Sequence, residues 1–361
     1  MKTDPFTRTP GIAGKAYIDM HYADTIVNNF ENNETSKYIY KIVGLRGSGK
    51  SVEYSKVLNH FQNNKRWLVY TLSAAGNPLE VLIAKLSHES FIKSTIHETT
   101  KNSSISAGGT IKLIGANTSI GISSTTKNNE HYYSDEAELS FMLKEAEKKQ
   151  LKVLVGIDDI ARTPEMVRFL SIWGSLLLEG YRNIYLVCTG LVKNIEDFTE
   201  ERNLTFFKRS DLIEIKGLSK FEVAYMYQKL LNLDELTAVK LAKMVKGYAY
   251  AYQVLGSLYF NKQSEQCLED LIPEFQRIIF QDSYNLIFKS LTKAEKELVK
   301  IIVNTQEGNV SDIKRAMDNP NSFNVLRSRL EKKHLLNLEQ RGYVKIELPF
   351  FREYINLWED Y

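Results

Sequence analysis

The sequence predicts an α/β fold in which a parallel-sheet domain precedes a helical domain and a small C-terminal domain. Three observations predict it: a glycine-rich loop behind an apolar run, a pair of acidic residues that ends a second apolar run, and a change to helical patterns after residue 216. Strands that alternate with helices are typical of parallel sheets, which bind ligands at the carboxyl ends of their strands.

Composition is ordinary for a soluble globular protein. The 361 residues are 43% hydrophobic and 25% charged, which is enough chain for two or three domains. The net charge of +3 does not by itself indicate nucleic-acid or membrane binding, so any basic patch must be local. The two cysteines form no metal-ligand pair by spacing, and no export signal or membrane-spanning run is evident. We therefore expect a cytoplasmic protein with no membrane partner.

A short buried strand is expected at 38–43, and the loop behind it fits G-x-x-x-x-G-K-[ST], with a helix expected over 52–63. Glycine lets backbone N–H groups converge on phosphate oxygens without a Cβ in the way. The N-terminus of the next helix adds donors and a partial positive charge. The loop therefore predicts a nucleotide phosphate site, formed by Gly44, Gly47, Ser48, Gly49, Lys50 and Ser51.

Two side chains of this loop have roles of their own. The ammonium group of Lys50 is expected to reach the β- and γ-phosphates. The hydroxyl group of Ser51 is expected to ligate Mg²⁺. ATP and Mg²⁺ are therefore the predicted cofactors.

The second apolar run, 151–157, ends in Asp158 and Asp159. Two adjacent carboxylates are costly to bury without a cation. Asp158 is expected to hold Mg²⁺ and Asp159 to orient or activate the attacking water, while an acidic helix cap is the alternative interpretation. A third strand, at 183–188, ends in Thr189, whose hydroxyl can reach the γ-phosphate or the water.

The remaining patterns divide the chain further. A strand is expected at 67–71, and helices begin at Pro78, running to about residue 93, and at Pro164. The segment 102–129 is rich in Ser, Thr, Gly and Asn and is expected to form a hairpin, either a finger for a partner or a plain surface feature. After residue 216, helices are expected at 220–231, 235–246, 248–260, 292–303, 311–317 and 322–334.

Two strands, at 336–339 and 342–348, follow the last three helices, and this is the winged-helix arrangement. Its third helix is basic and could enter a major groove, with a wing arginine at a phosphate or in the minor groove. The alternative is a protein-interaction module, because acidic residues nearly balance the basic ones. The candidate DNA contacts are Arg327, Arg329, Lys332, Lys333 and Arg341.

These parts in this order resemble the AAA+ ATPases, specifically the STAND-like and archaeal origin-recognition-like ATPases with a C-terminal winged helix. The resemblance covers nearly the whole chain. It rests on PFTRTPGIAGKAYID, GLRGSGKS, VLVGIDDI, IYLVCTG, NLTFFKRSDLIEIKGLS, KGYAYAYQVLG and the terminal RSRLEKKHLL and GYVKIELPFFREYI. It implies a P-loop AAA+ domain at 1–216, a helical lid at 217–282 and a winged-helix domain at 283–361.

By this resemblance, residues 44–51 are the Walker A motif, Asp158 and Asp159 are Walker B, and Thr189 is the first sensor. Tyr17 and Ile18 would lie against the adenine. Arg209, in FFKRS, is similar to a family arginine that touches the γ-phosphate of a neighbouring subunit or its own.

Two departures from the family pattern change the expectations. Many relatives have Glu where this chain has Asp159, one methylene shorter, so we expect slow hydrolysis, which suits a switch. The lid has Gly247-Tyr248-Ala249 where many relatives have a basic sensor. The resemblance thus implies an ATP-dependent switch that acts on DNA and can self-associate with ATP, and the alternative is a signalling ATPase that recruits a protein partner.

Overall fold

The chain is described by a computed structural model over residues 3–32, 37–95, 135–262, 266–305, 308–338 and 340–359. The hairpin expected at 102–129 lies outside these residues. None of the described helices is long and apolar enough to cross a membrane.

A five-stranded parallel sheet forms the centre of the first domain, in the order β2-β3-β4-β1-β5. The strand that precedes the glycine loop lies between two neighbours and is buried along its whole length. The four strands expected at 38–43, 67–71, 151–157 and 183–188 are present, and one unexpected strand forms an edge. The strands are β1 (Ile39–Val43), β2 (Trp67–Leu72), β3 (Lys152–Ile157), β4 (Ile184–Gly190) and β5 (Asp211–Glu214).

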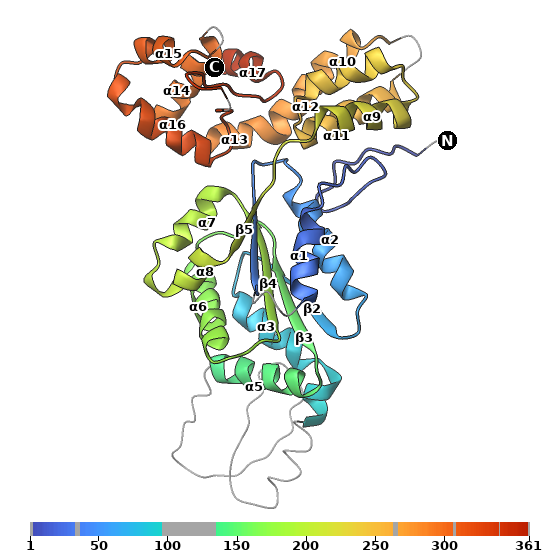
Figure 1. The fold of residues 1–361 in the computed structure, drawn as a ribbon, viewed down its shortest axis with the longest axis vertical. Helices are drawn as coiled ribbons and strands as arrows, with labels where there is room; N and C mark the ends of the chain where they lie inside the picture. The colour runs from blue at the N-terminus through green and yellow to red at the C-terminus, as the bar shows by residue number, and fades with distance from the viewer. Residues whose placement is uncertain are drawn as a thin grey trace, which may run out of the picture.

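Helices cover both faces of this sheet (Figure 1). One face is buried by α1 and α2 and the other by α3, α5 and α6, each face with its own apolar core. The helices of this domain are α1 (Tyr22–Glu31), α2 (Lys50–Gln62), α3 (Pro78–Ser87), α5 (Asp135–Lys148), α6 (Pro164–Leu178), α7 (Val192–Thr199) and α8 (Thr205–Arg209), with a 3₁₀ turn at Arg202–Leu204.

Local sequence signals fix two helix starts. Asn77 and Thr163 accept hydrogen bonds from the backbone N–H groups of Glu80 and Met166, and a proline follows each cap at the first helical position. The helix expected to run from Pro78 to about residue 93 is shorter than predicted. It ends at Ser87, and a turn separates it from a second helical stretch over 90–95.

The second half of the chain is helical and lies across the top of the sheet domain in Figure 1. We call α9–α12 the lid helices and α13–α17 the C-terminal helices. The π-helix Phe280–Tyr284 joins the two groups. The helices are α9 (Lys220–Leu231), α10 (Glu235–Val245), α11 (Ala249–Asn261), α12 (Ile272–Ile279), α13 (Asn285–Lys289), α14 (Lys293–Asn304), α15 (Val310–Ala316), α16 (Phe323–Lys332) and α17 (Phe351–Glu359), with 3₁₀ turns at Glu269–Leu271 and Pro320–Ser322.

The predicted pair of strands in the C-terminal region is reduced to isolated contacts. Single antiparallel bridges join Asn309 to Tyr343 and Asn337 to Lys345, and neither extends into a strand within the described residues. Gly308 lets the chain approach here, because a Cβ would lie 2.1 Å from the Val344 carbonyl oxygen. The chain then turns into α17, which the sequence analysis missed and which packs on α14.

The N-terminal segment, residues 3–18, contributes Phe6, Ala16 and Ile18 to the apolar core of the lid helices. Phe6 packs edge-on against Tyr252 of α11, with ring centroids 5.6 Å apart. Gly256 makes room for it, since a Cβ there would lie 2.2 Å from the Phe6 ring. Tyr252 also donates a hydrogen bond to the Ala16 carbonyl oxygen at 2.8 Å. The same apolar core continues from the lid helices into the C-terminal helices.

This packing predicts a large effect of Phe6→Ala. Phe6 is 5% exposed, whereas Phe221 on α9 is 87% exposed and serves as the matched control. We expect Phe6→Ala to lower the free energy of unfolding by about 3 kcal/mol, because it removes a buried ring and leaves a cavity. Phe221→Ala should change it by less than about 0.5 kcal/mol in the same urea titration. Equal effects of the two variants would show that the N-terminal segment does not pack on the lid.

Candidate functional site

The carboxyl ends of β1, β3 and β4 meet at one edge of the sheet. The parallel register pairs Val43 with Gly190 and Ile157 with Cys188, so the glycine loop, the two aspartates and Thr189 start from the same level. This arrangement follows from the predicted strands, since parallel strands present their carboxyl ends together. The chain positions predicted to bind phosphate, metal and water are therefore neighbours in space.

A cavity of about 500 Å³ opens at this edge, between the glycine loop, the N-terminal segment and the start of α11. It is lined by residues 46–53, by both aspartates and Thr189, and by Tyr17 and Ile18. Its charged lining consists of three basic and four acidic side chains: Arg8, Arg46, Lys50, Glu53, Asp158, Asp159 and Asp282. The cavity wall therefore carries no excess of positive charge.

The glycine loop has the backbone that a phosphate site requires. Gly47 and Gly49 have φ angles of 77° and 102°, a region that residues with a Cβ rarely adopt. A Cβ on Gly49 would meet no atom within 4 Å, so this part of the loop faces open space. The buried Ser48 hydroxyl has no hydrogen-bond partner among the described residues. An open backbone cradle with an unpaired polar atom fits a bound anion.

Lys50 lies at the start of α2 and folds back over the loop. Its ammonium group donates hydrogen bonds to the carbonyl oxygens of Gly44, at 3.1 Å, and Leu45, at 2.9 Å. Burial lowers the pKa of Lys50 to about 8, and the negative charges of Asp159 and Asp158 oppose that shift. A phosphate would supply the full negative partner that the two carbonyl dipoles replace only in part.

Asp158 is held by hydroxyl groups from two other elements. The Ser51 hydroxyl of the glycine loop donates to the Asp158 carboxylate at 3.0 Å, and the Thr189 hydroxyl at the end of β4 donates to the same carboxylate. The hydroxyl and carboxylate oxygens gathered here are the ligand types that Mg²⁺ prefers.

Asp159 has a different environment. Its backbone N–H donates to the Thr189 hydroxyl at 2.8 Å, and its φ of 54° lies in the left-handed region. Aspartate tolerates this conformation better than most residues, and strained positions of this kind cluster at functional sites. The residue is exposed and lines the cavity, so the turn directs two adjacent acids into different surroundings.

Tyr17 and Ile18 line the cavity, and the Tyr17 hydroxyl is engaged. It donates to the buried Glu53 carboxylate, whose other oxygen accepts from the Ala23 N–H at 2.9 Å at the start of α1. Burial, followed by the hydrogen bond to Glu53, raises the pKa of Tyr17. Glu53 thus ties α2, α1 and the N-terminal segment together beside the cavity.

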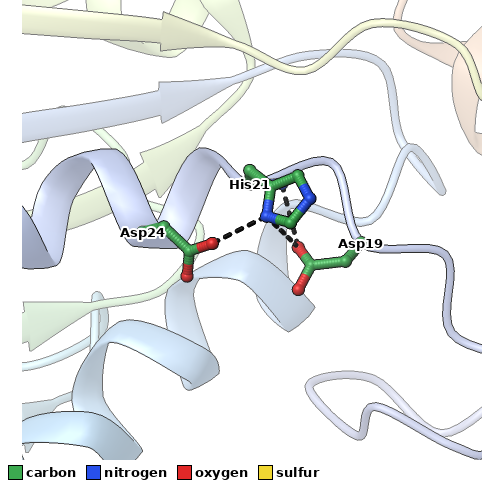
Figure 2. A group of neighbouring side chains, drawn as sticks. All are labelled: Asp19, His21 and Asp24. Atoms are coloured by element: carbon green, nitrogen blue, oxygen red, sulfur yellow. Dashed lines mark hydrogen bonds and ion pairs between the residues drawn. The ribbon is translucent and has the colours of Figure 1, made fainter.

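A cluster of three exposed side chains lies beyond Tyr17 at the start of α1 (Figure 2). The ligand atoms of Asp19, His21 and Asp24 lie within 4.8 Å of one another. The ammonium group of Lys56 pairs with the Asp19 carboxylate at 2.6 Å, so a side-chain cation already compensates one of the two acids. The hydrogen bond to Asp24 and the charge of Asp19 raise the pKa of His21. This cluster is outside the cavity and braces the N-terminus of α1.

Arg209 is not brought to the cavity. It is exposed at the last residue of α8 and is absent from the cavity lining, so contact with a ligand in the chain's own cavity does not fit this arrangement. The end of α8 is fixed by Lys41, a buried lysine of β1 whose ammonium group donates to the Phe207 carbonyl oxygen at 2.5 Å. Burial lowers the pKa of Lys41.

The candidate DNA contacts have different surroundings. Arg329 and Arg341 are exposed, and Arg327 is half-buried. The Lys332 ammonium pairs with Glu196 of α7 at 2.8 Å. Lys333 pairs at 2.7 Å with Glu295, which is 2% exposed. The expectation that Lys333 faces DNA does not fit this structure, because its charge compensates a buried carboxylate.

Sequence reasoning missed the lid residues that line the cavity. Tyr250 of α11 and the π-helix residues Asp282 and Ser283 all face it. Tyr248 lies behind the glycine loop and contacts it. One sequence feature pointed to this stretch: Gly247-Tyr248-Ala249 stands where the family pattern has a basic residue. That feature indicates a departure from the pattern, but it does not indicate which residue contacts the loop instead.

Solved structures of other proteins resemble this chain over nearly its whole length. The ORC2 protein of Aeropyrum pernix, in its ADPNP–ADP complexes, superposes with a TM-score of 0.54 over 94% of each chain at 11% sequence identity. The fold is of the AAA+ type. At this low identity the similarity concerns the fold alone.

Two further similar structures have lower TM-scores. Cdc6p from Pyrobaculum aerophilum gives 0.43 at 12% identity, with 97% of this chain and 98% of that chain covered. A STAND protein with a tetratricopeptide repeat sensor from Pyrococcus horikoshii gives 0.39 at 16% identity, with 98% of this chain and 44% of that chain covered. No protein-family model and no curated protein matches the sequence.

If the cavity takes a nucleoside triphosphate, the lowered pKa of Lys50 predicts that its affinity depends on pH. Above a pKa of about 8 the free protein loses the Lys50 proton, and a bound triphosphate draws it back. The affinity should therefore fall as pH rises, by about tenfold between pH 7 and pH 9. Calorimetry at pH 9 in two buffers of different ionisation enthalpy should show proton uptake on binding.

Lys50→Arg is the matched control, because a guanidinium stays protonated over this pH range. Its binding should show no proton uptake at pH 9. If wild-type binding takes up no proton at pH 9, the assignment of the titrating group is wrong.

Proposed function

We propose that this protein is a Mg²⁺-dependent ATPase that works as a nucleotide-controlled switch. The observation that carries the proposal is the contact between the Ser51 hydroxyl and the Asp158 carboxylate, 3.0 Å apart, beside the open glycine loop. It joins the phosphate loop after β1 to the acidic end of β3. The ORC2 protein, which has a similar fold, was solved in ADPNP–ADP complexes, and this supports a nucleotide as the class of ligand.

The roles follow from the contacts. Loop N–H groups and the Lys50 ammonium would bind the phosphates, and the oxygens of Ser51 and Asp158 would hold the metal ion. Mg²⁺, when bound, neutralises phosphate charge. Because four acidic side chains and only three basic ones line the cavity, its charged side chains alone do not favour a polyphosphate, and a bound Mg²⁺ would offset that balance. We infer that nucleotide and Mg²⁺ bind together.

Asp159 is the residue that we expect to orient the attacking water and accept its proton. It is exposed to the cavity, unlike Asp158, whose carboxylate is occupied by two hydroxyl donors. A free carboxylate beside the phosphate loop can accept a proton from water. Thr189 holds the peptide of Asp159 through its hydroxyl and so sets the direction of that side chain. The short aspartate side chain suits slow turnover.

The partner that we propose is duplex DNA, bound by the C-terminal region in the winged-helix manner. Exposed Arg329 on α16 and Arg341 on the turn between the two bridges are available for phosphate or base contacts. Lys332 is tied to the AAA+ domain, so it reaches DNA only if that ion pair opens.

A protein partner is the second candidate, and one observation favours it. The end of α16 makes two side-chain contacts with the sheet domain: an ion pair from Lys332 to Glu196 and a polar contact from His334 Nδ1 to Glu214, both at 2.8 Å. This helix end therefore already serves as a protein-contact surface. In this candidate a nucleotide-driven rearrangement exposes it to another protein.

Two substitutions separate binding from hydrolysis. Lys50→Ala should abolish MgATP binding, because it removes the cation of the phosphate loop. Asp159→Asn should bind MgATP normally but hydrolyse it about 100-fold more slowly, since an amide cannot take the water's proton. Equilibrium binding with a fluorescent ATP analogue and single-turnover hydrolysis measure the two effects. Hydrolysis by Asp159→Asn at the wild-type rate would overturn the role given to Asp159.

DNA binding is tested through its salt dependence. Arg329→Ala and Arg341→Ala should each weaken duplex binding and reduce the slope of log K against log salt by about 1. Lys65→Ala, an exposed basic position before β2, is the matched control and should leave the slope unchanged. If wild-type protein binds no duplex at low salt with MgATP, the DNA proposal fails and the protein-partner candidate is preferred.

A further inference from the structure

Two tyrosines of the lid hold the outer side of the phosphate loop. The Tyr248 hydroxyl donates to the Arg46 carbonyl oxygen at 2.8 Å, and the Tyr250 N–H donates to the Gly47 carbonyl oxygen at 3.0 Å. Two consecutive carbonyl groups of the loop are thus bound by the start of α11. Gly47 is required for this approach, because a Cβ there would lie 2.4 Å from the Tyr248 hydroxyl.

The Tyr248 hydroxyl also contacts Ser283 of the π-helix. A hydroxyl has one proton, and Tyr248 gives it to the Arg46 carbonyl oxygen, so Ser283 is the donor in the second hydrogen bond. Tyr248 and Ser283 are 6% and 2% exposed, so water does not compete for either bond. Tyr250 adds a second connection, since its hydroxyl donates to the Asp282 carboxylate at 2.6 Å.

Tyr284, which follows Ser283 in the π-helix, contacts the C-terminal helices. The Tyr284 hydroxyl donates to the Pro349 carbonyl oxygen at 2.7 Å, and its ring packs against Phe351 of α17 at 5.1 Å between centroids. Neighbouring residues 283 and 284 therefore connect the phosphate loop and the C-terminal region. A π-helix is rare, appears mostly as a single turn, and is frequent at functional sites.

We propose that Tyr248 is the lid residue that reads the state of the phosphate loop, and that the π-helix Phe280–Tyr284 passes that state to the C-terminal region. It takes the place that a basic sensor has in the expected pattern, but it contacts the loop peptide rather than the phosphate. Tyr248 is thus a positioning residue. The inference rests on the proposed nucleotide site, since a nucleotide is what would change the Arg46–Gly47 peptide.

The physical basis is that loop and lid share these hydrogen bonds. The N–H groups of a phosphate loop turn toward phosphate, and any tilt of the Arg46–Gly47 peptide moves its carbonyl oxygen relative to the Tyr248 hydroxyl. Because Ser283 bonds to the same hydroxyl, the π-helix must adjust with it. A ligand shifts such an equilibrium only through differential contacts, and this chain of bonds supplies them.

The test uses Tyr248→Phe and Ser283→Ala, which each remove one hydroxyl and keep the remaining packing. Tyr225→Phe, a lid tyrosine that is 60% exposed, is the matched control.

Spin labels at Asn63→Cys and Asp318→Cys, in a Cys267→Ser background, report the separation of the AAA+ domain and the C-terminal region. We expect wild type and Tyr225→Phe to change this separation between MgATP and MgADP. At MgATP concentrations that saturate each protein, Tyr248→Phe and Ser283→Ala should show no change in this separation, because each variant lacks one of the hydrogen bonds that connect the loop to the π-helix.

Hydrogen exchange of the nucleotide-free protein gives an independent readout. Tyr248→Phe should speed exchange of the Tyr250 amide and of the π-helix by about tenfold, since it removes a hydrogen bond that both segments share. Unchanged exchange, or a preserved nucleotide response in both variants, would overturn the inference. If the wild-type protein binds no nucleotide, the proposed function fails, while the exchange experiment still decides whether Tyr248 links the loop to the π-helix.

Discussion

The site depends on one contact, the hydrogen bond from the Ser51 hydroxyl to the Asp158 carboxylate. It forms because β1, β4 and β3 are parallel and adjacent, so their carboxyl ends lie at one level of the sheet. Thr189 lies on the strand between them and contacts both aspartates, through its hydroxyl with the carboxylate of Asp158 and the peptide of Asp159. Without this alignment, no carboxylate would lie opposite the glycine loop.

A switch requires that the helical half change its position when the cavity binds a ligand. The packing connects the two, because the apolar core of the helical half reaches the cavity. The lid helices and the C-terminal helices share one apolar core, so they do not move as unconnected bodies. The N-terminal segment belongs to that core through Phe6 and also lines the cavity through Tyr17. The cavity therefore lies between two cores, one in the sheet domain and one in the helical half. A ligand there contacts both, which is the arrangement expected of a switch.

The sequence predicted the elements that local patterns determine. The glycine loop, the strand ends at Asp158 and Thr189, and the helix start at Thr163 each depend on a few neighbouring residues, and the structure places them as expected. Contacts between distant residues were not predictable. Lys333 looked like a surface base, but Glu295, 38 positions away in sequence, buries it in an ion pair. The π-helix and the role of Tyr248 likewise depend on tertiary packing, which has no periodic signal. The helix Phe351–Glu359 did have one, in the spacing of Phe351, Tyr354 and Ile355.

The central claim is that the loop and Asp158 together form a site for a nucleotide with its metal ion. Titration calorimetry of the wild-type protein with ATP, in excess Mg²⁺ and then in excess EDTA, tests it most directly. We expect one nucleotide per chain with Mg²⁺ and at least about tenfold weaker binding without it, because the cavity lining does not attract a polyphosphate by itself. Equal affinity in both conditions would contradict the metal site, and no binding in either would contradict the nucleotide site.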